Sequence, residues 1–300
     1  MSALIRIKRA GPLTTIQDEG RHGMLAHGVS ASGPMDRAAY RRAGLLAGAT
    51  HRAGVEFTQA GLDLVLAEGE LRIGWDGGAF VVRINGREAS WPGSALLAAG
   101  DRLSVTPGAS GNYGYLRFGG ALDLDPVLGS HATNMRARLG GLDGRALVAG
   151  DELAFSGVGT LPEEVRRPDA EDGPIRFIRG LHWSWFSPKV QEDFVKGGFR
   201  ITPIMDRMGV RLADEGRVFG GESILSLVSD PVQPGDIQIL GDGTPIVLMR
   251  DHQPTGGYPR IGTVIGADLD RFAQMRPGEV VAFAPMSVER AHRMLRSGRA

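Results

Sequence analysis

The stretch Pro245–Ala267, PIVLMRDHQPTGGYPRIGTVIGA, holds a long polar segment between two apolar runs. PIVLM and TVIGA each have the length and composition of a short buried strand. A hairpin turn needs two to five residues, yet about a dozen separate these runs. The connection contains an acid, an imidazole, an amide, a hydroxyl and a glycine pair. These residues predict a ligand-binding loop carried by a β scaffold.

The glycine pair Gly256–Gly257 and the flanking prolines suggest how this loop is shaped. Glycine adopts positive φ easily, so we expect positive φ here, with backbone N–H groups turned toward a ligand. Tyr258 can stack on that ligand or donate to it. Such a loop suits an amide or carboxylate ligand, and the alternative is a rigid turn that is merely structural.

Most other periodic stretches of the chain also read as short strands. Glycine supplies 45 of the 300 residues, about twice the usual ~7%, which indicates many turns. The spacing of the turns favours antiparallel barrels or sandwiches over alternating βαβ units. The predicted strands are 62–68, 70–75, 79–86, 101–107, 114–120, 152–157, 175–180, 199–204, 237–241, 245–250 and 280–285.

Helix signals are few. Asp36 is positioned to cap a helix that ends near Gly48. Ser187 precedes PKVQEDFVKGG, which has proline in its first turn and glycine at its end. Short helices are also predicted to start at Asp268 and Ser287.

The segment LPEEVRRPDAEDGP (161–174) has the composition of a linker, because it is charged, contains three prolines and lacks apolar periodicity. We therefore predict two domains, 1–160 and 175–300. A Gly-acid turn that feeds an alternating strand recurs at 98–108, 148–157 and 276–285. This recurrence reflects either a duplication or convergent turn usage.

Composition excludes several classes of function. The net charge is zero, so no global attraction to nucleic acid or an anionic membrane is indicated. There is no cysteine, and the histidines lack metal-ligand spacing, so we predict no metal site. No P-loop or GxSxG motif occurs. Without a secretory signal or an apolar run of about 18 residues, a cytoplasmic protein is expected.

Four polar, glycine-rich segments stand out at 14–37, 119–134, 205–212 and 250–262. Acid and guanidinium groups lie close together in three of them. Each such pair is either a structural ion pair that holds a loop or part of a site for an anionic substrate. The pairs are Asp18 with Arg21, Asp36 with Arg37, Asp206 with Arg207, and Arg250 with Asp251.

Together, these segments resemble the carboxyltransferase-domain family that includes the C-type subunit of 5-oxoprolinase, KipA and allophanate hydrolase subunit 2. The family's Thr-Thr-hydrophobic-Gln-Asp-x-Gly-Arg-x-Gly run is matched by Thr14–Gly23, and its Gly-Val-x-x-x-Gly-x-Met-Asp run by Gly28–Asp36. GGALDLDPVLGSHAT (119–133), DRMGVRL (206–212) and the Asp-x-Gln-x-Thr-Gly-Gly-Tyr-Pro loop complete the resemblance.

The resemblance implies a mainly β fold of two tandem cyclophilin-like β-barrel modules with a few short helices. It implies a subunit of an ATP-dependent 5-oxoprolinase-type complex, an amidohydrolase that opens 5-oxoproline to glutamate. The implied partners are a B-type, KipI-like subunit and an A-type lactam hydrolase. The alternatives are a biotin-dependent carboxyltransferase that acts on urea or a related amide, with biotin on a separate carrier, and a non-catalytic KipA-like regulatory protein.

Candidate residues follow from the matched motifs. Asp36, Asp206 and Asp251 are predicted to be catalytic, positioning the substrate and handling protons. The predicted substrate-binding residues are Asp18, Arg21, Ser130, Arg207, Arg211, Gln253, Thr255, Gly256, Gly257 and Tyr258.

Overall fold

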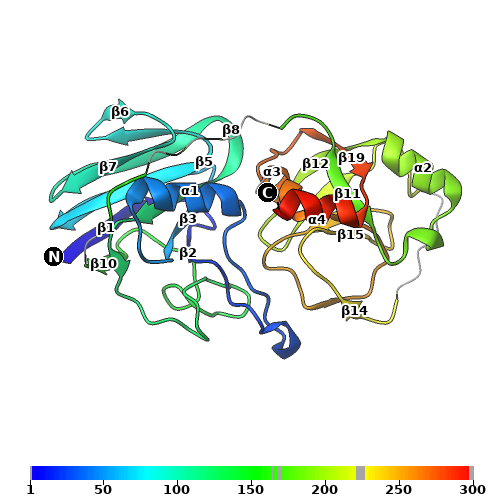
Figure 1. The fold of residues 1–300 in the computed structure, drawn as a ribbon, viewed down its shortest axis with the longest axis horizontal. Helices are drawn as coiled ribbons and strands as arrows, with labels where there is room; N and C mark the ends of the chain where they lie inside the picture. Colours follow the sequence, from blue (N-terminus) through cyan, green and yellow to red (C-terminus); the bar gives the residue numbers. More distant parts are fainter. Residues whose placement is uncertain are drawn as a thin grey trace. The chain divides into compact units, whose positions relative to one another are not determined.

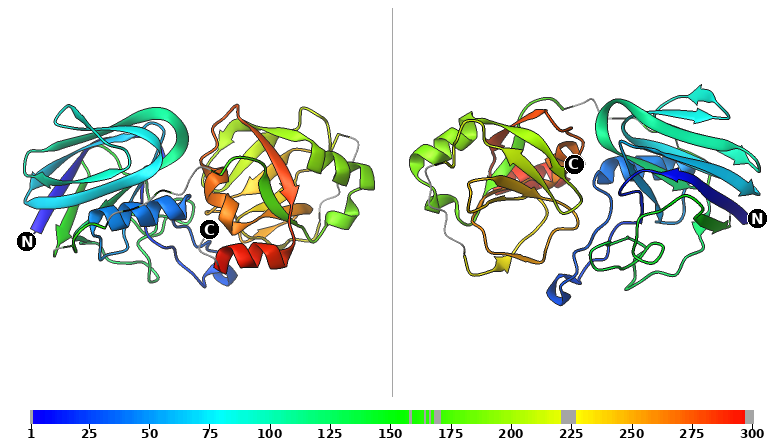
Figure 2. Two further views of the ribbon diagram at one scale, coloured as in Figure 1. Left: turned by 45° about the horizontal axis from the view of Figure 1, so that its top comes forward. Right: turned by 180° about the vertical axis from the view of Figure 1, so that it is seen from behind.

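The computed structural model describes residues 2–157, 159–163, 165, 167, 171–220 and 227–296. It divides into two compact units, one of residues 1–22 and 31–168 and the other of residues 23–30 and 169–300. Several residues of the predicted linker, 164, 166 and 168–170, lie outside the described part. The two units are considered separately below (Figures 1 and 2).

The first unit is built on a ten-stranded sheet. The strands run in the order β2-β3-β8-β4-β1-β10-β9, and β5 joins β6, β7 and β8. All their pairings are antiparallel. The bounds are β1 Ser2–Ala10, β2 Thr15–Gln17, β3 Gly54–Thr58, β4 Leu62–Glu68, β5 Glu70–Ile84, β6 Arg87–Ala89, β7 Gly93–Ala98, β8 Arg102–Phe118, β9 Ala121–Leu122 and β10 Glu152–Ser156.

Helix α1 (Arg37–Ala47) lies against this sheet, as Figure 1 shows. A Cβ atom at Gly74 of β5 would lie 2.4 Å from the Ala43 carbonyl oxygen and 2.5 Å from the Ala47 nitrogen. The helix backbone therefore packs directly on β5, and only glycine leaves room for it.

The second unit contains a closed barrel of seven strands. Their order is β11-β18-β15-β16-β13-β12-β19, and the parallel pairing of Ile175 with Phe283 closes the ring. The bounds are β11 Ile175–Arg179, β12 Gly198–Met205, β13 Gly209–Ala213, β15 Asp236–Ile239, β16 Pro245–Leu248, β18 Arg260–Val264 and β19 Val280–Pro285, with β14 Asp230–Pro231 and β17 Thr255–Gly256 outside the ring. The helices are α2 Pro188–Lys196, α3 Gly266–Ala273 and α4 Val288–Arg296, with 3-10 turns η1 Leu25–His27 and η2 Trp183–Trp185.

Alternate residues of the barrel strands form its core. Val210 and Leu212 of β13, Ile237 and Ile239 of β15, and Val247 of β16 are at most 1% exposed. Because side chains alternate across a strand, the residues between them lie on the outer face of the barrel wall. That outer face is where the candidate site is found.

The prediction of a mainly β fold with a few short helices is confirmed. The caps at Asp36 and Ser187 are confirmed, because each side chain accepts a hydrogen bond from the backbone three residues later. Helix α3 begins at Gly266, two residues before the predicted start. The sequence missed several strands, among them β1, β3 and β13, and the strand expected at TVIGA lies three residues earlier, as β18.

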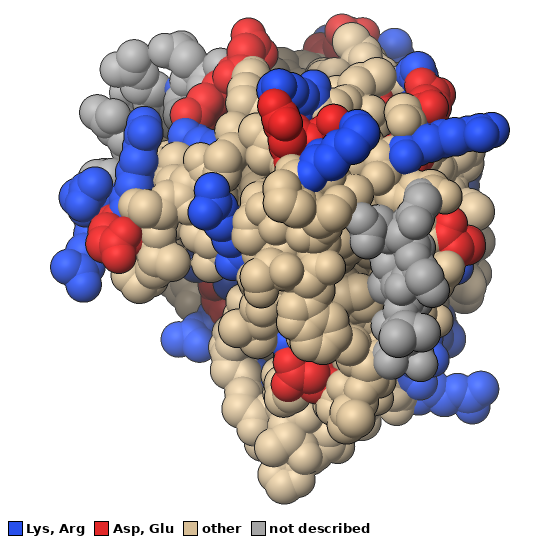
Figure 3. Space-filling model, turned by 90° about the vertical axis from the view of Figure 1, so that its right-hand side faces the viewer, with Lys and Arg blue, Asp and Glu red and all other residues tan. Residues whose placement is uncertain are grey.

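Three features of the described residues concern surface charge, membrane-spanning helices and metal ligands. In Figure 3, which draws one face of the molecule, acidic and basic side chains lie interspersed, so this face shows no large patch of one sign. None of the described helices is long and apolar enough to cross a membrane. Within the described residues, no three His, Asp or Glu side chains gather as metal ligands would.

Candidate functional site

The loop between β16 and β18 runs from Met249 to Pro259 and carries the Gly-Gly-Tyr-Pro signature. Its first residues stay close to the turn after β12, because Met249 N donates to the Met208 carbonyl over 2.8 Å. The loop then returns as β17, where Gly256 pairs with Asp230 of β14. This excursion explains why the connection is longer than a hairpin turn.

A buried ion pair anchors the start of the loop. The Arg207 guanidinium donates through Nε to Asp251 Oδ2 over 2.9 Å and through a terminal nitrogen to Oδ1 over 3.1 Å. The Asp251 backbone N–H also donates to the Arg207 carbonyl over 2.7 Å. Both side chains are almost fully buried. The structure therefore turns two predicted site residues toward each other, where they hold the loop.

His252 lies beside this pair and is 4% exposed. Burial lowers the pKa of its imidazole, although a hydrogen-bond contact with the Gln253 carbonyl opposes that shift. A buried imidazole that stays neutral suits a packing role in the loop.

The expectation of positive φ at Gly256 and Gly257 is wrong, since neither backbone lies in the left-handed region. A Cβ at Gly256 would lie 2.3 Å from Gln238 Nε2 and 3.2 Å from a Val232 methyl group. Gly256 is therefore required for close packing: it lets β17 lie against the side chain of Gln238.

A pocket of about 580 Å³ lies in the second unit, on the outer face of the barrel wall. Its walls come from β12, β13, β15 and β16, and the signature loop adds Gln253 and Tyr258. This volume falls within the range typical of small-molecule sites. The lining residues are Pro203, Ile204, Met205, Asp206, Met208, Gly209, Arg211, Gln238, Leu240, Ile246, Leu248, Gln253 and Tyr258.

The structure thus gathers four predicted site residues in one pocket: Asp206, Arg211, Gln253 and Tyr258. Asp206 Oδ1 accepts from the backbone N–H groups of Met208 and Gly209, which fixes its carboxylate at the β12–β13 turn. The Arg211 side chain is exposed, and its positive charge contributes to lowering the pKa of the Asp242 carboxyl. An exposed guanidinium at the pocket can bind an anionic ligand.

Gln238 is a pocket residue that the sequence did not reveal. It is 2% exposed, and its Oε1 accepts from Gln253 Nε2 over 3.3 Å. Its position between Ile237 and Ile239, which belong to the core, could have placed it on the outer face of the barrel wall. Its burial could not be predicted from the sequence, because the loop that covers it belongs to another segment of the chain.

Thr255 and Gly257 do not line the pocket. Thr255 is exposed on β17, where it pairs with Pro231. The Gly257 carbonyl accepts from the Leu227 backbone N–H over 2.7 Å. These residues shape the loop around the pocket.

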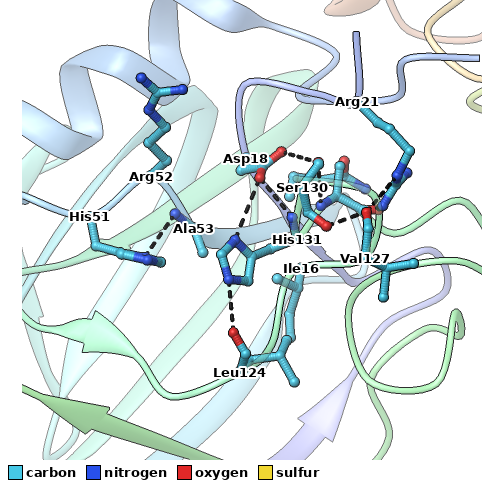
Figure 4. Close-up of polar contacts among 12 residues, drawn as sticks. Ile16, Asp18, Arg21, His51, Arg52, Ala53, Leu124, Val127, Ser130 and His131 are labelled. Atoms are coloured by element: carbon cyan, nitrogen blue, oxygen red, sulfur yellow. Dashed lines mark hydrogen bonds and ion pairs between the residues drawn. The ribbon is translucent and has the colours of Figure 1, made fainter. Parts of the chain in front are cut away.

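The remaining predicted residues lie in the first unit, and Figure 4 shows three of them. Asp18 accepts hydrogen bonds from Ser130 Oγ over 2.6 Å, from Gly20 N over 2.9 Å and from His131 N over 2.7 Å. Burial raises the pKa of this carboxyl, but the bonds from Ser130, Gly20 and His131 outweigh it, so the pKa lies below its ordinary value. Asp18 therefore stays ionised and joins the segment after β2 to the loop at Ser130.

Arg21 and Asp36 also have clear partners. Arg21 is 2% exposed and donates to the carbonyls of Val127, Ser130 and Ala132. Asp36 Oδ1 accepts from Ala39 N at the start of α1. These contacts stabilise a loop and a helix end within the first unit.

The family model for the carboxyltransferase domain, subdomain A and B, matches residues 27–285. The chain belongs to this carboxyltransferase-domain family. It is 34% identical to the C-type subunit of 5-oxoprolinase from Escherichia coli (strain K12), covering 96% of this chain and 93% of that protein. It is 30% identical to urea amidolyase of Saccharomyces cerevisiae, covering 95% of this chain but 17% of that protein.

Two solved structures resemble this chain over nearly its whole length. The K. lactis urea amidolyase superposes with a TM-score of 0.89 at 27% identity, over 99% of this chain and 19% of that one. The crystal structure of TTHA0988 gives a TM-score of 0.81 at 30% identity, over 94% of this chain and 55% of that one. The family resemblance drawn from the motifs is therefore confirmed.

Proposed function

We propose that this chain is a subunit of an ATP-dependent 5-oxoprolinase-type complex that opens the cyclic amide 5-oxoproline to glutamate. Two relatives named as the C-type subunit of 5-oxoprolinase support the proposal, because the match extends over more than nine tenths of each. The name of these relatives also supports a complex of several subunits. The partners in this proposal are a B-type, KipI-like subunit and an A-type lactam hydrolase.

The observation that carries the proposal is one pocket that combines a guanidinium with a side-chain amide. Arg211, which is exposed, and Gln253 both line this pocket. 5-Oxoproline presents a carboxylate and a lactam amide a few bonds apart. In this proposal Arg211 binds the carboxylate, and Gln253 binds the amide. The apolar side chains of Ile204 and Ile246 pack on the ring.

Asp206 is the predicted catalytic carboxylate that reaches this pocket. Its Oδ1 is held by two backbone amides, which orients the carboxylate before a ligand arrives. In this proposal Asp206 positions the substrate and takes up or returns a proton at the opening amide. Asp36 and Asp251 instead stabilise the fold: Asp36 caps helix α1, and Asp251 forms a buried ion pair with Arg207.

When ATP is bound in the complex, it supplies the free energy for opening an unstrained amide. Arg211 is the one basic side chain among the described residues that line the pocket. One guanidinium is a poor match for a triphosphate, and the sequence has no phosphate-binding P-loop. We therefore assign ATP to a partner chain and route no step through it here.

Reconstitution tests this function. The chain is mixed with its B-type and A-type partners, and ATP-dependent release of glutamate from 5-oxoproline is followed with and without it. Turnover that is unchanged when this chain is omitted contradicts the proposal. Arg211→Gln should raise KM about tenfold or more, because a charge-assisted hydrogen bond to the carboxylate is lost. Arg200→Gln is the control, since Arg200 is exposed and lies outside the pocket.

A second candidate is a biotin-dependent carboxyltransferase that acts on urea or a related amide. The backbone similarity to K. lactis urea amidolyase favours it. Biotin would arrive on a separate carrier and supply a carboxyl group, and the same amide side chain at Gln253 suits a ureido ring. Transfer of labelled carboxylate to urea, measured with a biotinylated carrier, separates this candidate from the first.

A further inference from the structure

Gln238 and Gln253 form a linked pair of side-chain amides at the pocket. Gln253 Nε2 donates to Gln238 Oε1 over 3.3 Å. Gln253 is half-buried and lines the pocket, whereas Gln238 is 2% exposed. The pair joins β15 to the signature loop.

The Gln238 side-chain amide has a hydrogen-bond partner at its oxygen but none at its nitrogen among the described residues. Its Nε2 is buried, and none of the described residues accepts a hydrogen bond from it. A buried donor without an acceptor costs free energy, and an apolar side chain of the same size would avoid that cost. The fold therefore retains Gln238 for something other than packing.

The neighbouring backbone fixes Gln238 in place. A Cβ at Gly256 would occupy the position next to Nε2, at 2.3 Å, so β17 lies directly on this amide. Val232, 2% exposed, borders the same space. A side chain covered in this way keeps one orientation, and so does the acceptor Oε1 that it offers to Gln253.

We propose that Gln238 is a positioning residue that makes the pocket specific for ligands with an amide N–H. Its Oε1 is an acceptor, so it engages the NH₂ side of Gln253 and turns the Gln253 carbonyl Oε1 toward the pocket. A fixed carbonyl oxygen accepts a hydrogen bond from a ligand N–H and repels a ligand oxygen at that place. The inference rests on the proposed function, because it identifies the lactam N–H as the group that the Gln253 carbonyl oxygen binds.

The test compares two probes that differ in one ring atom, 5-oxoproline and 5-oxotetrahydrofuran-2-carboxylate, in which a ring oxygen replaces the N–H. Their dissociation constants are measured by NMR titration of the full-length protein. We expect the wild-type protein to prefer 5-oxoproline by about tenfold, the order expected for one hydrogen bond replaced by an oxygen–oxygen repulsion. Failure to bind either probe, or equal binding of both, overturns the inference.

Variants at position 238 separate positioning from structure. Gln238→Met removes the acceptor, so the Gln253 amide is free to turn and the preference should fall to about twofold or less. Gln238→Glu keeps an acceptor oxygen and should retain the preference. A purely structural role predicts the reverse: both probes weaken together in Gln238→Met and their ratio stays at the wild-type value.

A control variant and a direct NMR measurement complete the test. Gln233→Met is the matched control, because Gln233 is exposed and lies outside the pocket. The side-chain NH₂ signals of Gln253 report the pair directly in the free protein. They should show a hydrogen-bonded NH₂ in the wild type and in Gln238→Glu, but not in Gln238→Met. The same signals in all three proteins would refute the positioning role. A reconstituted complex without 5-oxoproline turnover refutes only the proposed function.

Discussion

Removal of the Asp251 carboxylate should destabilise the barrel strongly. Asp251→Leu leaves the Arg207 guanidinium buried at 2% exposure without this carboxylate. Breaking a buried ion pair by removing one partner costs about 3–5 kcal/mol, because the remaining charge has lost its solvation and its counter-ion. Whole domains are stable by about 5–15 kcal/mol, so the loss is a large fraction of the total.

The assay is native-state hydrogen exchange at the backbone amides of β15 and β16. It reports the barrel alone, which avoids a two-state assumption for a chain of two units. Each ~1.4 kcal/mol is a factor of ten, so exchange at these amides should accelerate by about two to four powers of ten. Amides of β8 belong to the other unit and serve as an internal reference.

The barrel offers a matched control. Arg200 and Glu215 form a two-point contact of 2.8 and 3.1 Å, almost the geometry of the Arg207–Asp251 pair, but both are exposed. Glu215→Leu should leave exchange nearly unchanged, since water and salt already screen that pair. The double variant Arg207→Met with Asp251→Leu should recover part of the lost stability. The reasoning is refuted if Asp251→Leu and Glu215→Leu behave alike, or if the double variant is no more stable than Asp251→Leu.

Three further predictions concern the first unit. The folded pKa of Asp18 lies below its unfolded value, so its contribution to stability is present above the unfolded pKa and is lost as pH falls through the folded pKa. Ser130→Ala raises that pKa, so the loss in Tm should be greatest near neutral pH and shrink in acid; an equal loss at both would contradict the assignment. Asp36→Ala removes the cap of α1 and should cost about 1 kcal/mol in urea unfolding, with α1 amides exchanging first. Gly74→Leu should cost about 1–3 kcal/mol or more by thermal unfolding, because its side chain meets the α1 backbone, and a stable variant would contradict that contact.

Some features of this protein could be predicted from the sequence because they depend on nearby residues. The caps at Asp36 and Ser187 bond to the backbone three positions away, so helix starts follow from local spacing. Alternation predicted β4, β10 and β19, since each strand exposes one face and buries the other. The ordered motifs were sufficient to assign the family.

Other features are fixed only by contacts between distant residues. Two acid–guanidinium neighbours occur along the chain, Asp206 with Arg207 and Arg250 with Asp251. In the structure, however, the ion pairs join Arg207 to Asp251 and Arg250 to Asp270. Side chains of consecutive residues point apart, so their partners come from other segments.

The pocket has the same origin. Arg211, Gln238 and Gln253 come from two strands and a loop that meet only when the barrel closes. Sequence determined which polar groups are present, and β pairing between distant segments decided which of them face one another. The Gly-Gly pair illustrates the difference: its presence was evident from the sequence, but its reason, the close packing of Gly256 on Gln238, is a tertiary contact.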